Sequence, residues 1–539
     1  METNVLYYGD NLEILRKHIP DESVDLIYLD PPFNSNATYN VLFKEPSGEA
    51  SQAQMTAFDD TWQWGKTSAE TYHDIIANCP NPNVAKVMDS MHELIGPSAM
   101  MAYLVMMTAR LIELHRVLKS TGSIYLHCDP KASHYLKLVM DSVFGTEQFR
   151  NEIIWKRTSS HSDTIQGKVV HMGRIHDVIL FYTKSNAAER NEVYSLYTDE
   201  YLENFYRFQD ADGRRYTLDN IAGPGGATKG NPQYEFLGVT RYWRYSKERM
   251  EELYKQGRII QAKPGSVPRY KRYLDEMSGV PLQDVWTDIN PIGAQAAERL
   301  GYPTQKPEAL LERIIEASSN KGDIILDPFC GCGTTIVAAQ RLKRRWIGID
   351  ITYLAVGTME WRLRKVFPRV QYTVIGAPTD LAGAKDLAQR DKYQFQWWAV
   401  SKAGGQPYGG RKKGADTGID GYLYFVDDKD KVKKAIISVK GGVNVNVAMV
   451  RDLGHVIDRE SADIGVFITL EPPTRPMITE ATTKGFYTPP FSDKKYPRLQ
   501  ILTIEELLQG KKPEVPNWVA PIPSRVREKQ AGYQAQKLL

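Results

Sequence analysis

The sequence predicts an α/β fold, with a mostly parallel, doubly wound sheet followed by a smaller α/β unit. Short apolar runs typical of buried strands alternate with helical patterns over residues 1–184, and the alternation resumes over 296–375. A shorter series of strands and helices follows over 391–512. The chain has 539 residues, 42% hydrophobic and 25% charged, which suits a globular protein of more than one domain.

The first series opens with a strand at 4–8 and a turn at Gly9-Asp10. We expect further strands at 24–29, 123–126, 151–155 and 177–182, and helices at 12–18, 103–118 and 134–144. Residues 35–100 are polar, aromatic and turn-rich without clear alternation, which is typical of a long functional loop.

Residues 185–295 lose the regular pattern and carry many Arg and Lys residues with Tyr, Trp and Gly between them. The pattern returns at Pro307, a favoured first helical residue, with a helix through 310–315 and strands at 324–326 and 346–349. Residues 376–390, rich in Ala, Gly and Asp, are expected to form a linker. The smaller unit is expected to contain a helix near 446–460 and strands at 422–426, 434–439, 465–470 and 499–503. We assign no structure to the tail, 513–539.

Composition sets loose limits on function. A net charge of +3 neither requires nor excludes nucleic acid, because a local basic face would suffice. The four cysteines are too few for a disulfide framework, and the single pair Cys330 and Cys332 lacks the four ligands of a structural zinc site. No secretory h-region opens the chain and no apolar run reaches about 18 residues, so we expect a cytoplasmic protein with no membrane partner.

The motif Asp327-Pro328-Phe329-Cys330-Gly331-Cys332-Gly333 closes an expected strand and precedes a helix from Thr334. Ligands of open α/β sheets bind at the carboxyl ends of strands, and small residues let the backbone approach a ligand closely. The helix N-terminus suits a carboxylate, and Asp350, after the next strand, suits ribose hydroxyls. The pattern indicates a nucleoside cofactor; an ordinary strand-to-helix turn and a generic nucleotide fold are the alternatives.

A second motif, Asp30-Pro31-Pro32-Phe33, closes the apolar run at 24–29. It suits the exocyclic amino group of a nucleobase, whose lone pair is delocalised into the ring. The Asp30 carboxylate and the Pro31 carbonyl can accept its two N–H bonds, proline stiffens the turn, and Phe33 offers a face for stacking. The alternative is a turn that only caps a strand.

These motifs and the run from Tyr302 to Pro307 resemble the β-class DNA amino-methyltransferases, in which the catalytic half precedes the cofactor half. The resemblance covers about residues 1–370 and implies a Rossmann-like sheet that binds S-adenosyl-L-methionine. It places Asp10 near the adenine of the cofactor and Lys306 near the methionine part. The cofactor-binding residues that it implies are Asp10, Lys306, Asp327, Pro328, Phe329, Gly331, Gly333, Thr334 and Asp350.

The resemblance also implies double-stranded DNA as partner, a target base that leaves the duplex, and a target-recognition region at 185–295 whose Arg and Lys contact phosphates and guanine edges. An Asp at the start of the catalytic motif favours adenine N6, since cytosine-N4 enzymes more often begin with Ser; cytosine N4 stays an alternative. Phe33, where Tyr is commoner, is a mild departure. Because a sulfonium methyl is already activated, we expect Asp30 to orient the amino group before it acts as a base.

Two sets of residues near these motifs have two interpretations each. Asn34, Tyr39, Phe58, Trp62 and Trp64 either close over the extruded base or form a packed aromatic cluster. His127-Cys128-Asp129, after an expected strand, either line the rim of the site or serve packing and capping.

Residues 391–512 resemble the Mrr-like branch of the PD-(D/E)xK nucleases. The segment Gly414 to Gly421 supplies Asp420, and the strand Ile436 to Val439 leads to Lys440, but Ser438 stands where the second acidic residue is expected. Gln394 and Gln396 stand on the preceding helix where an acid could help. In such sites the Asp holds Mg²⁺ and the Lys helps to activate water. An active nuclease and a degenerate fold that binds DNA or partners both remain open.

The resulting hypothesis is a DNA adenine-N6 methyltransferase in restriction-modification or phage defence, with a nuclease-like domain in the same chain. The alternatives are cytosine-N4 methylation, or a modification subunit whose nuclease-like domain only docks partners. We expect the chain to act as a homodimer or with subunits of a restriction system.

Overall fold

The computed structural model describes residues 1–32, 38–44, 50–59, 63–158, 172–293, 296, 298–300, 302, 304–407, 418–426, 432–490 and 492–516; over 38–44 and 50–59 it describes the backbone alone. The chain forms two compact units. Of the described residues, one unit contains 1–191 and 284–516, and the other contains 192–283.

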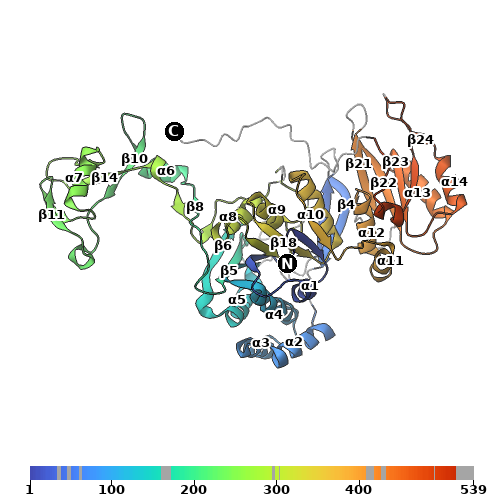
Figure 1. Cartoon of the computed structure of the whole chain (residues 1–539), viewed down its shortest axis with the longest axis horizontal. Coiled ribbons are helices and arrows are strands. Elements are labelled where there is room, and N and C mark those ends of the chain that lie inside the picture. The colour runs from blue at the N-terminus through green and yellow to red at the C-terminus, as the bar shows by residue number, and fades with distance from the viewer. Residues whose placement is uncertain are drawn as a thin grey trace. The chain divides into compact units, whose positions relative to one another are not determined.

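The first unit contains a nine-stranded sheet (Figure 1). β7 runs antiparallel to both of its neighbours, and the other pairs are parallel. The expectation of a mostly parallel sheet is therefore confirmed. Across the sheet the strands are β16 (Val285–Trp286), β6 (Phe149–Lys156), β7 (His176–Thr183), β5 (Leu118–Cys128), β2 (Val24–Leu29), β17 (Ile324–Asp327), β18 (Arg345–Asp350), β1 (Val5–Tyr8) and β19 (Thr373–Ile375).

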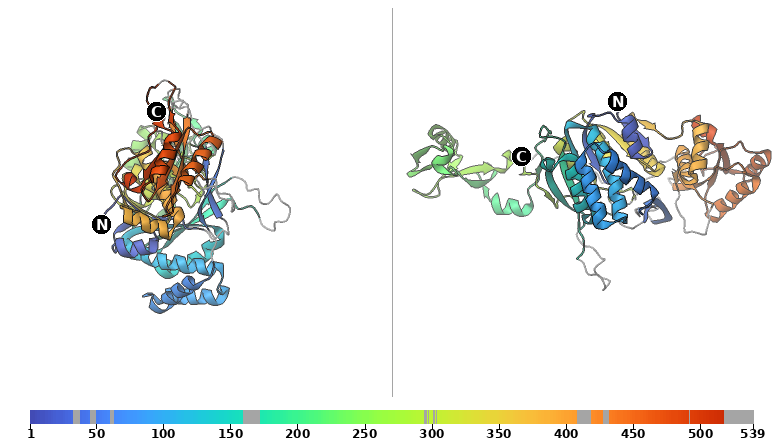
Figure 2. Two further views of the ribbon diagram at one scale, coloured as in Figure 1. Left: turned by 90° about the vertical axis from the view of Figure 1, so that its right-hand side faces the viewer. Right: turned by 90° about the horizontal axis from the view of Figure 1, so that it is seen from below.

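Helices cover both faces of this sheet. The right-hand view of Figure 2 looks onto the blue helices that cover one face of the sheet. In Figure 1 the helices of the opposite face lie above the sheet. Among the described residues, no helix has the length and apolar character needed to cross a membrane. The first face carries α1 (Asn11–His18), α4 (Ala99–Val117) and α5 (Pro130–Phe144), and the second carries α8 (Glu308–Ser318), α9 (Thr334–Arg341) and α10 (Tyr353–Val366).

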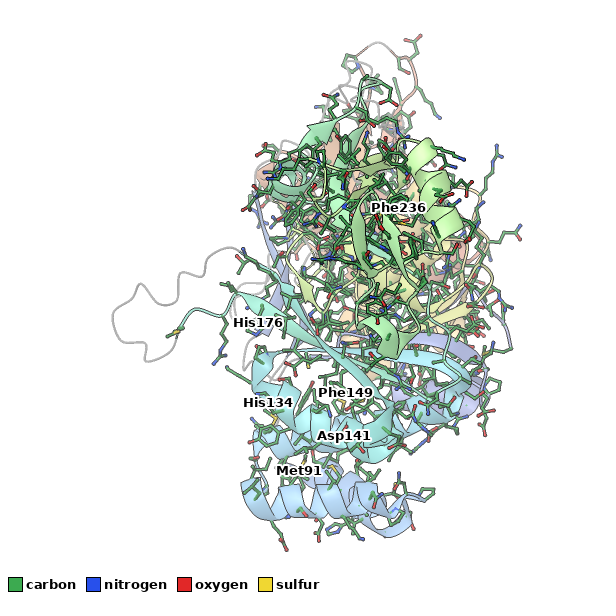
Figure 3. All side chains as sticks on the ribbon, turned by 90° about the vertical axis from the view of Figure 1, so that its left-hand side faces the viewer. Met91, His134, Asp141, Phe149, His176 and Phe236 are labelled. Carbon is green, nitrogen blue, oxygen red and sulfur yellow. The ribbon has the colours of Figure 1, made fainter. Side chains whose placement is uncertain are left out.

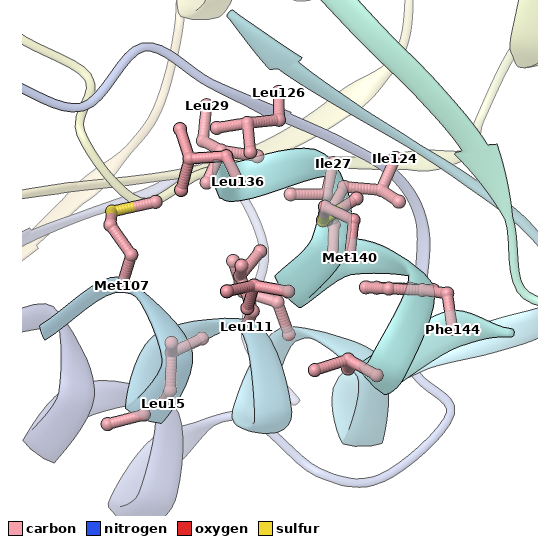
Figure 4. Close-up of a cluster of buried hydrophobic side chains, with 14 of the residues drawn as sticks. Leu15, Ile27, Leu29, Met107, Leu111, Ile124, Leu126, Leu136, Met140 and Phe144 are labelled. Atoms are coloured by element: carbon pink, nitrogen blue, oxygen red, sulfur yellow. The ribbon is translucent and has the colours of Figure 1, made fainter. Parts of the chain in front are cut away.

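The centre of the sheet is apolar on both faces. All four residues of β17 are buried, and so are all residues of β2 except Asp25, as expected for parallel strands covered by helices. Figure 4 shows the contact between the first helical layer and the sheet. There the buried side chains are Leu15 of α1, Ile27 and Leu29 of β2, Met107 and Leu111 of α4, Ile124 and Leu126 of β5, and Leu136, Met140 and Phe144 of α5.

The expectation of an irregular loop over 35–100 is wrong in part. A hairpin of β3 (Thr38–Lys44) and β4 (Ala50–Asp59) is followed by α2 (Lys66–Asn78) and α3 (Pro82–Ile95). Asn81 caps α3 and Pro82 occupies its first turn, while Val84, Met88 and Met91 are buried on one side of it. These buried residues recur at helical spacing, but they stand in a segment that is otherwise rich in polar and turn-forming residues, which weakens the sequence signal.

A five-stranded mixed sheet lies toward the C-terminal end of the first unit, and it contains every expected strand. β22, β23 and β26 are parallel, and β20 and β21 are antiparallel to their neighbours. The order is β20 (Gln406–Pro407), β21 (Gly421–Val426), β22 (Val432–Lys440), β23 (Ile464–Thr469) and β26 (Leu499–Thr503). Around it are α12 (Lys392–Lys402), α13 (Val447–Arg459), α14 (Arg475–Thr483), α15 (Ile504–Leu508) and a hairpin of β24 (Phe486–Tyr487) and β25 (Tyr496–Pro497).

The expected linker at 376–390 contains helix α11 (Leu381–Arg390) instead of irregular chain. Asp380 caps it by accepting a hydrogen bond from the backbone N–H of Gly383, and Ala384 and Leu387 are buried. The segment therefore packs as a helix, although its composition suggested a linker. The tail beyond residue 516 lies outside the described residues.

The second unit is built from short strands and two helices around Trp243, which is buried with Phe236 and Met250. Figure 3 labels Phe236 in this unit. Its four-stranded antiparallel sheet has the order β13 (Ile259–Ile260), β14 (Arg269–Tyr273), β10 (Arg215–Asn220) and β9 (Phe208–Gln209). Two strand pairs and two helices complete the unit: β11 (Gln233–Phe236) with β12 (Val239–Tyr242), β8 (Tyr194–Ser195) with β15 (Val280–Pro281), α6 (Asp199–Phe205) and α7 (Lys247–Lys255).

Candidate active site

Four neighbouring strands of the large sheet end at one edge, and each carries a motif. β17 pairs in parallel with β2 and β18, and β18 pairs with β1. Asp30 follows β2, Asp327 closes β17, Asp350 closes β18, and Gly9-Asp10 follow β1. The topology thus brings motifs about 300 residues apart in the sequence to adjacent strand ends, the edge at which sheets of this type bind ligands.

Two glycines shape the loop that runs from Asp327 to Gly333. Gly331 (φ 49°) and Gly333 (φ 76°) adopt the left-handed backbone conformation that favours glycine. The N–H of Gly331 donates to Oδ2 of Asp350 at 2.9 Å, so the loop is tied to the end of the next strand. Helix α9 starts directly after the loop at Thr334, which leaves the N–H groups of its first turn available to an anion.

Two carboxyl groups hold this loop. Asp327 is buried and accepts hydrogen bonds from Oγ1 of Thr335 at 2.5 Å and from the N–H of Phe329 at 3.0 Å. Asp350 accepts from Gly331 and from both the N–H and Oγ1 of Thr352. Desolvation raises the pKa of Asp327 to about 7 and that of Asp350 to about 6.

The raised pKa of Asp327 predicts a pH dependence of stability. An unfolded Asp titrates near pH 4, so between about pH 4 and pH 7 the folded chain holds a proton that the unfolded chain releases. The free energy of unfolding is therefore expected to fall as pH rises through this window. In urea titrations, Asp327→Asn should raise stability relative to the unsubstituted chain more at pH 8 than at pH 4. An equal effect at both pH values would contradict the burial argument.

The two carboxylate oxygens of Asp30 differ in their surroundings. Its Oδ2 is 2.5 Å from Nζ of Lys306, a side chain that is itself buried. Its Oδ1 is buried without a hydrogen-bond partner among the described residues. Since a buried acceptor without a donor costs about 1–3 kcal/mol, such an oxygen at the end of a strand is suited to accept a hydrogen bond from a ligand. Pro31 is buried, Pro32 is half-buried, and Phe33 lies outside the described residues.

Asp10 and its neighbours form a network that the sequence did not reveal. Asp10 caps α1, and its Oδ2 is 2.8 Å from Nη2 of Arg110. Arg110 also donates to Oδ1 of Asn11 at 2.5 Å, and Nδ2 of Asn11 donates to the carbonyl of Pro328 at 2.7 Å. The turn after β1 is thereby fixed to the glycine loop. The expected contact between Asp10 and adenine stays a prediction.

Arg362 of α10 is a second residue that was missed. It is 2% exposed and donates to the carbonyl of Cys332 at 3.1 Å and to Oγ1 of Thr334 at 3.2 Å. Its other terminal nitrogen lies 2.8 Å from Oε1 of Glu308. Arg362 therefore supports the glycine loop from beneath. An Arg near the end of a helix usually lies in solvent, so the sequence offered no signal for this role.

Of the two interpretations of His127, Cys128 and Asp129, the structure supports packing and capping. His127 is fully buried, with Nδ1 2.9 Å from the hydroxyl of Tyr28 and Nε2 3.1 Å from Oδ2 of Asp177. Cys128 is buried, and Asp129 caps α5. Trp64 packs against Tyr72 and His92. The side chains of Tyr39 and Phe58, and the whole of Asn34 and Trp62, lie outside the described residues.

In the smaller sheet, Asp420 lies against the strand that leads to Lys440. Its Oδ2 accepts from the N–H of Val439 at 2.7 Å and from Oγ of Ser438 at 3.5 Å. Lys440 ends β22, and Gln396 is buried. Gln394 is engaged elsewhere, because its Oε1 accepts from the N–H of Tyr353 at 2.8 Å. Within the described ranges, no three His, Cys, Asp or Glu side chains gather in a group that could hold a metal.

This chain is similar in sequence to a family of DNA methylases and to several of their curated members. A family model described as DNA methylase matches residues 24–356. The type II methyltransferase M.EcaI of Enterobacter cloacae is 30% identical over 360 residues, which cover 66% of this chain and 68% of that protein. The Mod subunit of the type III restriction-modification enzyme StyLTI of Salmonella typhimurium is 28% identical over 63% of this chain and 50% of its own length. The DNA adenine methyltransferase YhdJ of Escherichia coli is 26% identical over 66% of this chain and 82% of its own length.

Proposed function

Because the chain belongs to the DNA methylase family whose model matches residues 24–356, we propose that it methylates adenine N6 in double-stranded DNA at a specific sequence. One observation carries the proposal. Asp30 and the loop from Asp327 to Gly333 close two adjacent parallel strands, and the buried Oδ1 of Asp30 has no partner among the described residues. A catalytic acceptor thus lies next to a backbone shaped for a nucleoside cofactor.

The residues at this edge fit S-adenosyl-L-methionine. Asp350 can accept hydrogen bonds from ribose hydroxyls, and the side chain of Ile351, 60% exposed directly after it, offers an apolar surface to a purine. Gly331 and Gly333 give the loop the left-handed backbone conformation that shapes it, and the start of α9 at Thr334 can receive a carboxylate. Asp10 and Phe329 complete the proposed set. When bound, this cofactor supplies a sulfonium methyl that a nitrogen lone pair can attack.

The catalytic half would prepare the amino group of the base. Oδ1 of Asp30 accepts one N–H and the carbonyl of Pro31 accepts the other, so the nitrogen lone pair is drawn out of conjugation with the ring. Burial of Pro31 and the stiff Pro31-Pro32 turn hold these two acceptors in place. Phe33 would stack against the base. The reaction requires that adenine leaves the duplex.

Residues 192–283 are the proposed target-recognition unit. Some of their cations form ion pairs with acidic residues inside the unit: Arg214, Arg249, Arg258, Lys271 and Arg272. Others are exposed and form no ion pair with any described residue. Lys229, Arg241 and Arg244 are among these, and we propose them as contacts to phosphates.

The test is single-molecule sequencing of DNA from cells that express the intact chain, with cells expressing Asp30→Asn as control. We expect N6-methyladenine at one sequence motif, absent with the substituted chain. If N4-methylcytosine is detected instead, the target base is cytosine and not adenine. The absence of any modified base would contradict autonomous methylation and favour a subunit that needs partners, as the name of the StyLTI Mod subunit indicates for that relative.

We further propose that residues 391–512 form a nuclease-like domain that binds DNA or a partner within a restriction or defence system and does not cleave. Asp420 adjoins Ser438, as in the nuclease pattern, but its Oδ2 is occupied by the N–H of Val439, and Ser438 is a weak, uncharged metal ligand.

Cleavage is tested by incubating the intact chain with Mg²⁺ and unmethylated DNA. We expect no cleavage, and gain of Mg²⁺-dependent cleavage in Ser438→Asp would show that the missing acid is the cause. Cleavage by the unsubstituted chain that is lost in Asp420→Asn would establish Asp420 as a metal ligand and overturn the docking proposal.

A further inference from the structure

The short segment before α8, Thr304 to Pro307, is held in place by its backbone conformation and by hydrogen bonds. Thr304 adopts a left-handed backbone conformation (φ 62°), which is unfavourable for a β-branched residue. Gln305 holds the segment from both sides: its Oε1 accepts from the N–H of Leu300 at 2.8 Å, and its Nε2 donates to the carbonyl of Glu298 at 2.6 Å. Pro307 then caps α8. The residue between these anchors is Lys306.

Lys306 directs its charge toward Asp30. It is 8% exposed, and its Nζ lies 2.5 Å from Oδ2 of Asp30, a residue 276 positions away. Asp177 lies in the same surroundings but is satisfied by His127 and Arg157 at 3.1 and 3.0 Å. Burial alone would raise the pKa of Asp177, but His127, Lys306 and Arg157 together hold it below its usual value.

The two carboxylate oxygens of Asp30 are thus unequal. Oδ2 is held by a charge-assisted hydrogen bond, while Oδ1 is buried and unpartnered among the described residues. A carboxyl group held at one oxygen by a charge-assisted hydrogen bond cannot rotate freely. This constraint prepares Oδ1 to accept an N–H bond.

We propose that Lys306 is a positioning residue for methyl transfer, which holds Oδ2 of Asp30 so that Oδ1 is presented to the amino group of the target base. The inference rests on the proposed function and deepens it. It assigns Lys306 to the catalytic carboxylate, whereas the family resemblance suggested a contact with the methionine part of the cofactor.

The decisive comparison is between Lys306→Met, Lys306→Arg and the control Lys119→Met. Lys119 pairs with Asp25 at 2.7 Å at the other end of β2, so its substitution removes a similar ion pair that also involves a carboxylate of the β2 region. We expect Lys306→Met to lower kcat about 10- to 100-fold, as for other small misplacements of reacting groups. Lys306→Arg should recover most of this loss. Cofactor Kd, measured by titration calorimetry, should stay within about threefold, and Lys119→Met should change neither quantity.

A cofactor Kd that rises while kcat at saturating cofactor is unchanged would overturn the inference in favour of a cofactor contact. Lys306→Met tested in an Asp30→Asn background gives an independent measurement. If Lys306 acts through Asp30, the second substitution should lower kcat no further; additive losses would also overturn the inference. The double variant has no unpaired buried charge, so it covers the case in which Lys306→Met alone fails to fold. Activity of the unsubstituted chain separates these outcomes from failure of the proposed function itself.

Discussion

Replacing Asp30 by Asn is expected to lower kcat for methyl transfer by about 100- to 1,000-fold, the range found when one preorganised hydrogen-bonding group is removed from an active site. Asn keeps the size of Asp30 but loses its charge, and Nζ of Lys306, now 2.5 Å from Oδ2, would lose its anionic partner. A neutral amide oxygen is also a weaker acceptor than a carboxylate oxygen for the N–H group of the base. The measurement is transfer of labelled methyl from saturating S-adenosyl-L-methionine to DNA.

The matched control for this substitution is Asp25→Asn. Asp25 lies in β2, the strand that Asp30 directly follows, and forms a comparable ion pair, 2.7 Å from Nζ of Lys119, near the opposite end of that strand. It should leave kcat within about twofold. Asp30→Asn should also leave cofactor Kd nearly unchanged, because the cofactor is assigned to β17 and β18. Similar losses of kcat in both variants would mean that the strand, and not the carboxylate, is responsible.

Gly333→Ala is expected to have the second-largest effect, on both cofactor binding and stability. A Cβ at this position would lie 2.5 Å from Cγ of Met359, and the backbone there has φ 76°. The left-handed conformation costs about 1–2 kcal/mol and overpacking about 1–3 kcal/mol more. Because the loop supports the cofactor, we expect Kd to rise at least about tenfold, measured by calorimetry beside urea unfolding.

Two further variants separate the causes of that effect. Gly322 also has a left-handed backbone (φ 90°), but a Cβ there meets nothing within 4 Å, so Gly322→Ala reports the conformational cost alone. Adding Met359→Ala to Gly333→Ala makes room for the new methyl group and should restore part of the cofactor affinity. If Gly322→Ala were as damaging as Gly333→Ala, the contact with Met359 would be irrelevant.

The sequence predicted the sheet well because buried parallel strands are continuous apolar runs. Asp30, Asp327 and Asp350 each follow such a run, so their place at strand ends could be expected from local pattern alone. The order β2-β17-β18-β1 is likewise consistent with the resemblance, which required the catalytic and cofactor halves to meet.

Interactions between distant side chains could not be predicted in this way. The ion pair of Lys306 with Asp30 and the hydrogen bond of Asn11 with Pro328 join residues 276 and 317 positions apart. Both depend on which strands become neighbours, and no local periodicity encodes that. Arg362 shows the same limit, since only packing of α10 against the loop reveals why a cation is buried there.

The position of β17 between β2 and β18 has a consequence for how the chain is made. β1 and β2 leave the ribosome about 300 residues before β18 and β17, the strands that pair with their inner edges. At about 5–20 residues per second, that delay is on the order of 15–60 s. During translation the nascent chain therefore carries apolar strands with unpaired edges, a state prone to aggregation. Yield of folded protein should accordingly depend on chaperones and on expression temperature more than its final stability would suggest.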